Sequence, residues 1–166
     1  MNNRLAEQAN YWDTTVHHAK SQGEIIELLD TFGAQGIQIT LGRNKGRQAW
    51  LVRFAWREAI YRFVFIPLEC QYPEKVSSFG GKRQAHSDHA MWQMGRIAVH
   101  FVKAILTAAD AQPDALFGFM ELPQEAGGGQ SMTTAEIGVQ QLAQTVRLLP
   151  ESAGSWQVMD GESEVR

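Results

Sequence analysis

The sequence is poor in the residues and runs that mark several common classes of protein. It has a single cysteine, Cys70, which excludes an internal disulfide and suits a reducing compartment. No apolar run approaches the roughly 18 to 20 residues that a membrane-spanning helix needs. Residues 1–18 contain neither an apolar core nor a small-residue cleavage site, so a secretory signal is not expected. The sequence therefore predicts a cytoplasmic protein with no membrane partner.

The sequence also lacks the spacings that usually accompany metal binding and catalysis. It has no C-x-x-C, H-E-x-x-H or G-x-S-x-G motif. His86 and His89 have H-x-x-H spacing, but we place His86 before a helix and expect both to be bystanders. The glycine-rich segments GGKRQ and GGGQS lack the lysine and hydroxyl ending of a phosphate loop. No metal, cofactor or catalytic residue is predicted, and a non-catalytic protein is favoured over an enzyme.

The chain contains enough hydrophobic and aromatic residues to form one core. Of its 166 residues, 44% are hydrophobic and 20% are charged, and eight are Phe, five Trp and three Tyr. This length and composition predict one soluble globular domain. We expect the domain to cover residues 1–149 and residues 150–166 to form an acidic, disordered tail.

Local patterns predict the order α-α-β-β-β-α-α-α. Ser21 to Glu24 form a capping-box pattern before a helix that Gly33 ends, and Ser87 is expected to cap a long later helix. Residues 69–84 have no clear period and are expected to form an exposed, mobile, basic loop. The predicted elements are helices at 3–20 and 22–32, strands at 36–41, 47–58 and 59–67, and helices at 87–110, 114–121 and 133–147. This order predicts an α+β fold in which a three-stranded antiparallel meander packs against the long helix.

The second and third strands alternate between two kinds of side chain. With a turn centred on Glu58 and Ala59, one face is strongly aromatic; its members are Trp50, Val52, Phe54, Trp56, Tyr61, Phe63 and Phe65. Glu-Ala is not a favoured hairpin turn, so the register is open to a shift of one residue. We expect the aromatic face to be core beneath the long helix. The opposite face then carries Arg53, Arg57 and Arg62.

The long helix has one continuous polar line on an otherwise apolar surface. His89, Gln93, Arg96, His100 and Lys103 follow one another at steps of three and four residues. Such a line is more often a solvated edge than a site, so we expect a wet edge with the rest of the helix covered.

Basic residues are concentrated in the middle of the chain. Residues 36–103 hold 11 Lys or Arg against 4 Asp or Glu, whereas residues 104–166 hold 2 against 9. This asymmetry suggests a polyanion-facing region, although solvated surface charges also gather by chance. The predicted nucleic-acid-binding residues are Arg43, Lys45, Arg47, Arg53, Arg57, Arg62, Lys82, Arg83 and Arg96.

Three segments, EIIELLDTFGAQGIQI, GRIAVHFVKAIL and LFGFMEL, resemble a family of small, uncharacterised α+β proteins of bacterial genomes, prophages and other mobile elements. Its pattern is a meander, then a helix of the form A-x-R-x-x-W-R-x-x-x-x-W-x-x-A-x-L and an F-L-P-Y-like segment. The resemblance covers residues 21–134. Arg96 matches the arginine of the Trp-Arg pair and Phe101 the second tryptophan, while Gly95 and Gly118 depart from the pattern's tryptophan and proline.

The sequence thus leaves two hypotheses about function. The first is a non-catalytic accessory protein of a phage-like or mobile element that binds nucleic acid through a basic sheet face and loop; the mobile-element part comes from the resemblance alone. The alternative is a protein-interaction or assembly subunit, as a homo- or hetero-oligomer, with no nucleic-acid role.

Overall fold

A computed structural model describes residues 4–44, 47–122 and 132–135 of the chain. Three predicted features lie outside these residues, wholly or almost wholly: the helix at 133–147, the acidic tail at 150–166 and the side chain of Lys45.

The described elements form three small sheets and two long helices. In chain order they are η1 (Ala6–Gln8), α1 (His18–Phe32), β1 (Gln35–Asn44), β2 (Arg47–Trp56), β3 (Ala59–Phe65), β4 (Val76–Phe79), β5 (Lys82–Ala85), α2 (His86–Ala111), η2 (Pro113–Phe119), β6 (Glu121–Leu122) and β7 (Met132–Thr133). The strands β1, β2 and β3 form an antiparallel meander in that order. The α+β class and the three-stranded meander are therefore confirmed.

The hairpin between β2 and β3 turns one residue earlier than expected. Arg57 and Glu58 have φ values of 46° and 65°, and Trp56 pairs with Ala59. Two successive positive φ values match the twist of the flanking strands, as in a type I′ turn, even without glycine. The predicted faces are unchanged, because Phe54 pairs with Tyr61 within the aromatic face.

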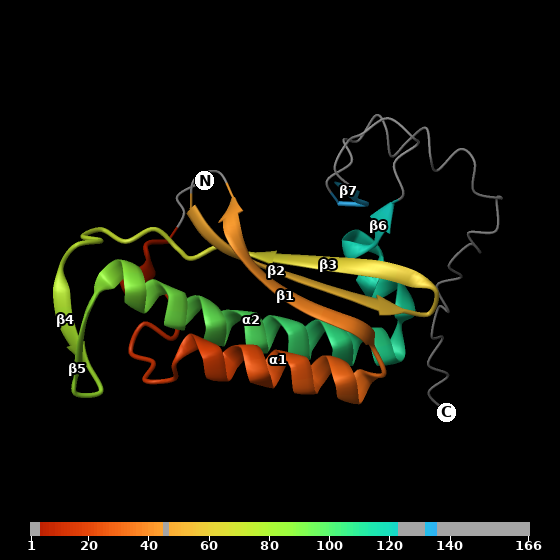
Figure 1. Cartoon of the computed structure of the whole chain (residues 1–166), viewed down its shortest axis with the longest axis horizontal. Coiled ribbons are helices and arrows are strands. Elements are labelled where there is room, and N and C mark those ends of the chain that lie inside the picture. Colours follow the sequence, from red (N-terminus) through yellow and green to blue (C-terminus); the bar gives the residue numbers. More distant parts are fainter. Residues whose placement is uncertain (1–3, 45–46, 123–131, 136–166) are drawn as a thin grey trace, which may run out of the picture. The chain divides into compact units, whose positions relative to one another are not determined.

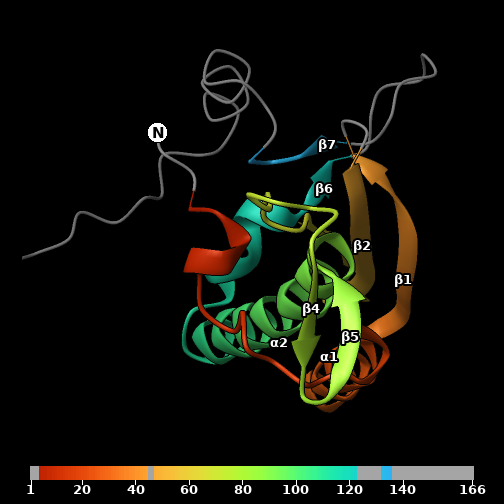
Figure 2. The ribbon, with the colours of Figure 1, turned by 90° about the vertical axis from the view of Figure 1, so that its left-hand side faces the viewer.

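The core lies between this aromatic face and the two long helices. Figure 1 shows α1 and α2 side by side along the meander, and Figure 2 shows both on one side of it. Trp50, Phe54 and Phe63 are at most 1% exposed and belong to the same buried cluster as residues of both helices. The cluster members from the helices are Ile25, Leu29, Met91, Met94, Ala98, Val99, Val102, Leu106 and Ala109.

The helix α1 begins earlier than the capping-box pattern indicates. His17 is its N-cap, and the Nδ1 atom of His17 accepts a hydrogen bond from the Ala19 N–H at 3.2 Å. Ser21 is instead fully buried inside the helix, where it faces Gly95 of α2. The predicted cap is wrong because contact with α2 determines the position of Ser21. Gly33 does end the helix, with a φ of 88°.

The segment before α1 is not the helix expected at 3–20. Within its described residues only the three-residue turn η1 precedes His18. Backbone carbonyls of Ala6 and Asn10 accept hydrogen bonds from the Gln93 side chain of α2, each at 2.9 Å. These carbonyls are therefore satisfied by tertiary contacts in place of a helical ladder.

Residues 69–84 do not form the expected loop throughout. From Val76 onward the chain forms the antiparallel hairpin β4–β5, which turns at Gly80 and Gly81 with φ values of 57° and 83°. β5 leads directly into α2, whose N-cap is Ala85, so the cap predicted at Ser87 is wrong. The predicted short helix at 114–121 is the 3-10 segment η2.

Candidate functional site

The structure divides the predicted basic residues among several places. Arg53 and Arg62 lie on the sheet face opposite the helices, where both meet Glu121. Arg53 donates to one oxygen of this carboxylate at 2.8 and 3.0 Å, and the Nε of Arg62 is 3.8 Å from the other. The Glu121 side chain is 6% exposed, so its charge compensates both cations at close range. The basic character of this sheet face is thereby reduced.

Three further predicted residues are occupied elsewhere. Arg57, in the β2–β3 turn, has its guanidinium 4.3 Å from the ring centre of Trp56. Arg47 donates to the Pro67 carbonyl and lies 3.2 Å from Glu69. Arg96 lies 2.7 Å from Glu24, between the two long helices. These contacts place the three side chains on different parts of the fold.

Two of the remaining described candidates, Arg43 and Lys82, lie at one depression, which we call the basic hollow. It has a volume of about 660 Å³, and its lining includes His17, His18, Arg43, Gln48, Gln84, Asp88 and Trp92. Lys82 reaches its border, with the Nζ atom 5.9 Å from the ring centre of Trp92. Arg83 follows Lys82 on β5 and is exposed. Strands far apart in sequence thus bring Arg43 and Lys82 to the same depression.

The first turn of α1 adds to the positive character of the basic hollow. His17 and His18 stand at the helix N-terminus, where backbone N–H groups carry a partial positive charge. The Nδ1 of His18 is buried without a hydrogen-bond partner among the described residues. Burial first, and then the neighbouring His17, lower the pKa of His18. One acidic residue, Asp88, also lines the hollow.

His86 and His89, which we expected to be bystanders to any site, anchor the N-terminal segment. They are 5% and 0% exposed and pack edge-on against the ring of Trp12. His86 donates from Nδ1 to Glu7 at 3.0 Å, and His89 donates from Nε2 to the Trp12 carbonyl at 2.5 Å. The opposite nitrogen of His89 accepts from Gln84, which fixes the neutral ring in one tautomer.

The prediction that the polar line of the long helix is exposed to solvent is wrong for its first two residues. His89 and Gln93 are both fully buried beneath the N-terminal segment. Arg96, His100 and Lys103 instead border a groove of about 640 Å³ between α1 and α2, which we call the helix groove. Periodicity places the five residues on one line, but it gives no information about what covers that line.

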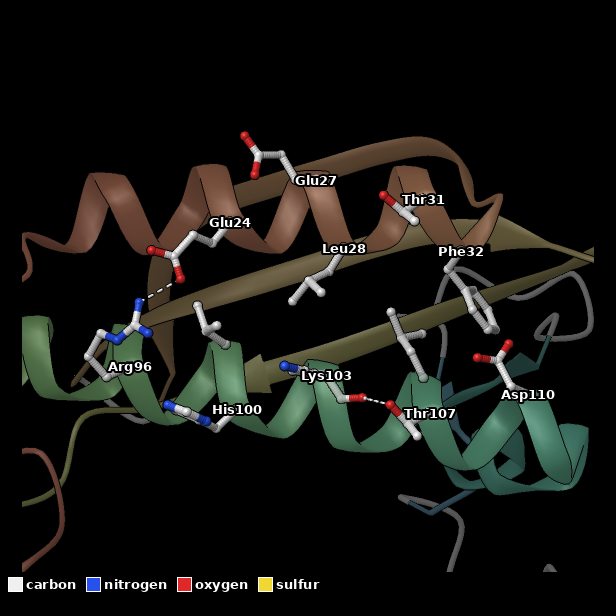
Figure 3. A pocket seen from close by; sticks show the side chains of 12 residues that line it. Glu24, Glu27, Leu28, Thr31, Phe32, Arg96, His100, Lys103, Thr107 and Asp110 are labelled. Carbon is white, nitrogen blue, oxygen red and sulfur yellow. Dashed lines mark hydrogen bonds and ion pairs between the residues drawn. The ribbon is translucent and has the colours of Figure 1, made fainter.

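Figure 3 shows the helix groove from close by, with α1 along one side and α2 along the other. Leu28 and Phe32 extend from α1, and the nearly buried Val99 and Leu106 contribute from α2. Glu24 and Glu27 lie on the α1 side, and Arg96, His100 and Lys103 on the α2 side. The ring of His100 also stacks on Tyr11, with 4.8 Å between ring centres. Sequence reasoning found the α2 side of the groove but missed α1 entirely.

Groups that could support other chemistry are scarce in the described residues. No three His, Cys, Asp or Glu side chains within them are placed to hold a metal ion. The Cys70 thiol has a pKa raised to about 11, by burial first and then by Glu7, against a lowering effect of Arg47. In the part of the chain that the structure describes, no helix has the length and apolar character to cross a bilayer.

Comparison with known proteins gave no match to a family model, to a curated protein or to a solved structure. Any functional proposal therefore rests on the geometry of the basic hollow and of the helix groove.

Proposed function

We propose that the protein is a non-catalytic, nucleic-acid-binding accessory protein of a phage-like or mobile element. In this proposal the basic hollow contacts the phosphate backbone, with Arg43 and Lys82 as the principal cations. The observation that carries it is the convergence of Arg43 from β1 and Lys82 from β5 on one hollow at the N-terminus of α1. Backbone N–H groups and basic side chains are the groups that bind phosphates most often.

Charge pairing favours the hollow over the sheet face that the sequence first suggests. Arg53 and Arg62 share the carboxylate of Glu121, whereas Arg43, Lys82 and Arg83 form no ion pair within the described residues. A cation that already has a carboxylate partner gains less from a phosphate, because the first interaction must be weakened. Contacts to phosphate carry little sequence information, so broad rather than sequence-specific binding is expected.

The direct test measures binding of labelled single-stranded DNA, duplex DNA and RNA by fluorescence anisotropy over a range of salt concentrations. We expect affinity for at least one of them to fall steeply with salt. In the double variant Arg43→Ala/Lys82→Ala, binding weakens for every sequence, and the log–log slope against salt decreases by about two, one unit for each lost phosphate contact.

Arg57→Ala is the matched control, because Arg57 is an exposed cation at the other end of β2 from the hollow. It should bind as the unaltered protein does. Absence of binding to all three nucleic acids at low salt would overturn the proposed function. An equal loss in Arg57→Ala and in the double variant would move the contact surface away from the hollow.

The helix groove favours a second candidate function, an assembly subunit that pairs with a protein. Grooves with apolar side chains and charged borders are typical places for helices of a partner to dock. The sheet face opposite the helices adds exposed Ile60 and Val64 of β3, at 41% and 38% exposure, and Ile66 follows directly after β3 at 36%. A monomer at all concentrations in light scattering, with no protein bound, would count against this candidate.

A further inference from the structure

Apart from Asp110, which lines one end of the groove on the α2 side, the charges along the helix groove are separated by sign. Glu24 and Glu27 lie on the α1 side, while Arg96, His100 and Lys103 lie on the α2 side. Among the described residues one ion pair crosses the groove, Glu24 with Arg96 at 2.7 Å. Glu27 and Lys103 are exposed and have no ion-pair partner in the same part of the chain. The groove thus has an acidic border and a basic border with charge left to pair.

The two helices are parallel, since Glu24 lies opposite Arg96 near one end of the groove and Phe32 lies near Asp110 at the other. Consider a second copy related by a two-fold axis that runs along the groove. Its α1 then lies over α2 of the first copy, and its α2 lies over α1. The acidic border of each copy therefore faces the basic border of the other, so the dimer contains two such contacts.

A two-fold axis across the helices gives a different result. It stacks α1 on α1 and α2 on α2, so that the acidic border faces its own copy and the basic border faces its own copy. Like charges in such positions cost free energy, whereas opposite charges select the partner and its orientation. The charge layout therefore distinguishes one symmetric arrangement from the other.

We propose that the helix groove is a self-association surface, in which a second copy of this chain docks about a two-fold axis along the groove. Glu27 of each copy pairs with Lys103 of the other. Leu28 in the middle of the groove and Phe32 at one end, both half-buried in one copy, supply apolar surface to the contact. On α2, the small side chain of Thr107 is exposed in the groove and leaves room for close approach. This inference does not depend on the proposed nucleic-acid function.

A charge-reversal experiment tests both the surface and the symmetry. Sedimentation velocity over a range of concentrations measures association of the unaltered protein and of the variants Glu27→Lys and Lys103→Glu. Each variant alone places like charges at both contacts, so we expect its association to weaken at least about tenfold. In a 1:1 mixture both contacts of the heterodimer are attractive. The introduced lysine of one variant faces the introduced glutamate of the other, and the original Lys103 faces the original Glu27. Association in the mixture is expected to return to the original level.

Association can recover in the mixture only if residues 27 and 103 pair between chains. An ion pair within one chain would not be affected by adding the other variant. Asp30→Lys makes the same charge change as Glu27→Lys on an exposed position of α1 that does not line the groove. Lys75→Glu, before β4, is the control for Lys103→Glu. Neither control should alter association. Thermal melting by circular dichroism verifies that all variants fold.

The samples must be free of nucleic acid, as judged by absorbance at two wavelengths, so that bridging by nucleic acid does not imitate a dimer. A monomer at the highest soluble concentration overturns the proposal. It is equally overturned if both variants associate normally, or if the mixture associates no better than either variant alone. None of these outcomes affects the test of the basic hollow, which is measured on Arg43 and Lys82.

Discussion

Gly95 lies where α2 passes closest to α1 and to the sheet. A Cβ atom at this position would lie 3.0 Å from the Cβ of Ser21 and 3.2 Å from the ring of Trp50. Both neighbours are fully buried and have little freedom to move. The family pattern that the sequence resembles has a tryptophan here, and this packing has no room for one. A larger side chain at position 95 would therefore require α2 to move away from α1 and the sheet.

Two mid-helix glycines allow this packing to be tested with one control. Gly95→Leu is expected to destabilise the protein by about 1–3 kcal/mol, because the added side chain overpacks the helix contact. Gly23 of α1 has nothing within 4 Å of an added Cβ, so Gly23→Ala should stabilise by about 0.5–1 kcal/mol. Urea denaturation measures both. Equal stability of Gly95→Leu and the unaltered protein would show that the helices can separate at this point.

Cys70 is expected to react slowly. Its thiol contacts the His86 carbonyl at 3.4 Å, and burial with the nearby Glu7 raises its pKa to about 11 from 9.0. The reactive form is the thiolate, so at pH 8 alkylation should be roughly a hundredfold slower than for the same thiol in the urea-unfolded chain. Glu7→Gln removes one of the two causes and should accelerate the reaction. Comparable rates in the folded and unfolded chain would contradict this placement of the thiol.

Among the elements, those that depend on local sequence were predictable. The alternation of β2 and β3 indicated the aromatic core face, and Gly33 marked the end of α1. Each of these follows from a period or from a residue with unusual backbone freedom. Both features are set by the local sequence, so packing against neighbouring elements does not alter them.

The elements that depend on distant partners were not predictable in the same way. Ser21 resembles a cap in sequence but is a packing residue against Gly95. The strands β4 and β5 span four residues each, too short for alternation to stand out, and Phe79 of β4 stacks on His89 of α2. The site shows the same limit, because the carboxylate that meets Arg53 comes from Glu121, 68 residues later in the chain.

At the scale of the whole molecule, the attachment of residues 4–17 to α2 should make stability depend on pH. Burial, with a smaller contribution from His86, lowers the pKa of His89 despite the hydrogen bond to Trp12 and the charge of Asp13, which act to raise it. Burial also lowers the pKa of His18. Burial alone would raise the pKa of Glu7, but hydrogen bonds from His86 and the Gln71 N–H outweigh it and lower this pKa.

The signs follow from linkage between protonation and folding. A histidine with a lowered folded pKa binds its proton more readily in the unfolded chain, so its contribution is complete above its ordinary pKa of 6.5 and is lost as pH falls below it. A carboxylate with a lowered folded pKa contributes fully above its ordinary value of 4.5 and loses that contribution below it. Stability should therefore fall in two steps, first below about pH 6.5 through the histidines and then below about pH 4.5 through Glu7.

Two variants separate these steps in urea denaturation at pH 8, 5.5 and 4. His89→Gln loses stability at pH 8, because it disrupts the contacts with Trp12, Gln84 and Phe79, but its further loss between pH 8 and 5.5 should be smaller than in the unaltered protein. Glu7→Gln should retain the step below pH 6.5 and flatten the step below pH 4.5. If the His89→Gln profile ran parallel to the original at all three pH values, proton binding at His89 would not be linked to folding. The attachment of the N-terminal segment would then owe its strength to packing of Trp12 and to the Gln93 hydrogen bonds, which do not titrate.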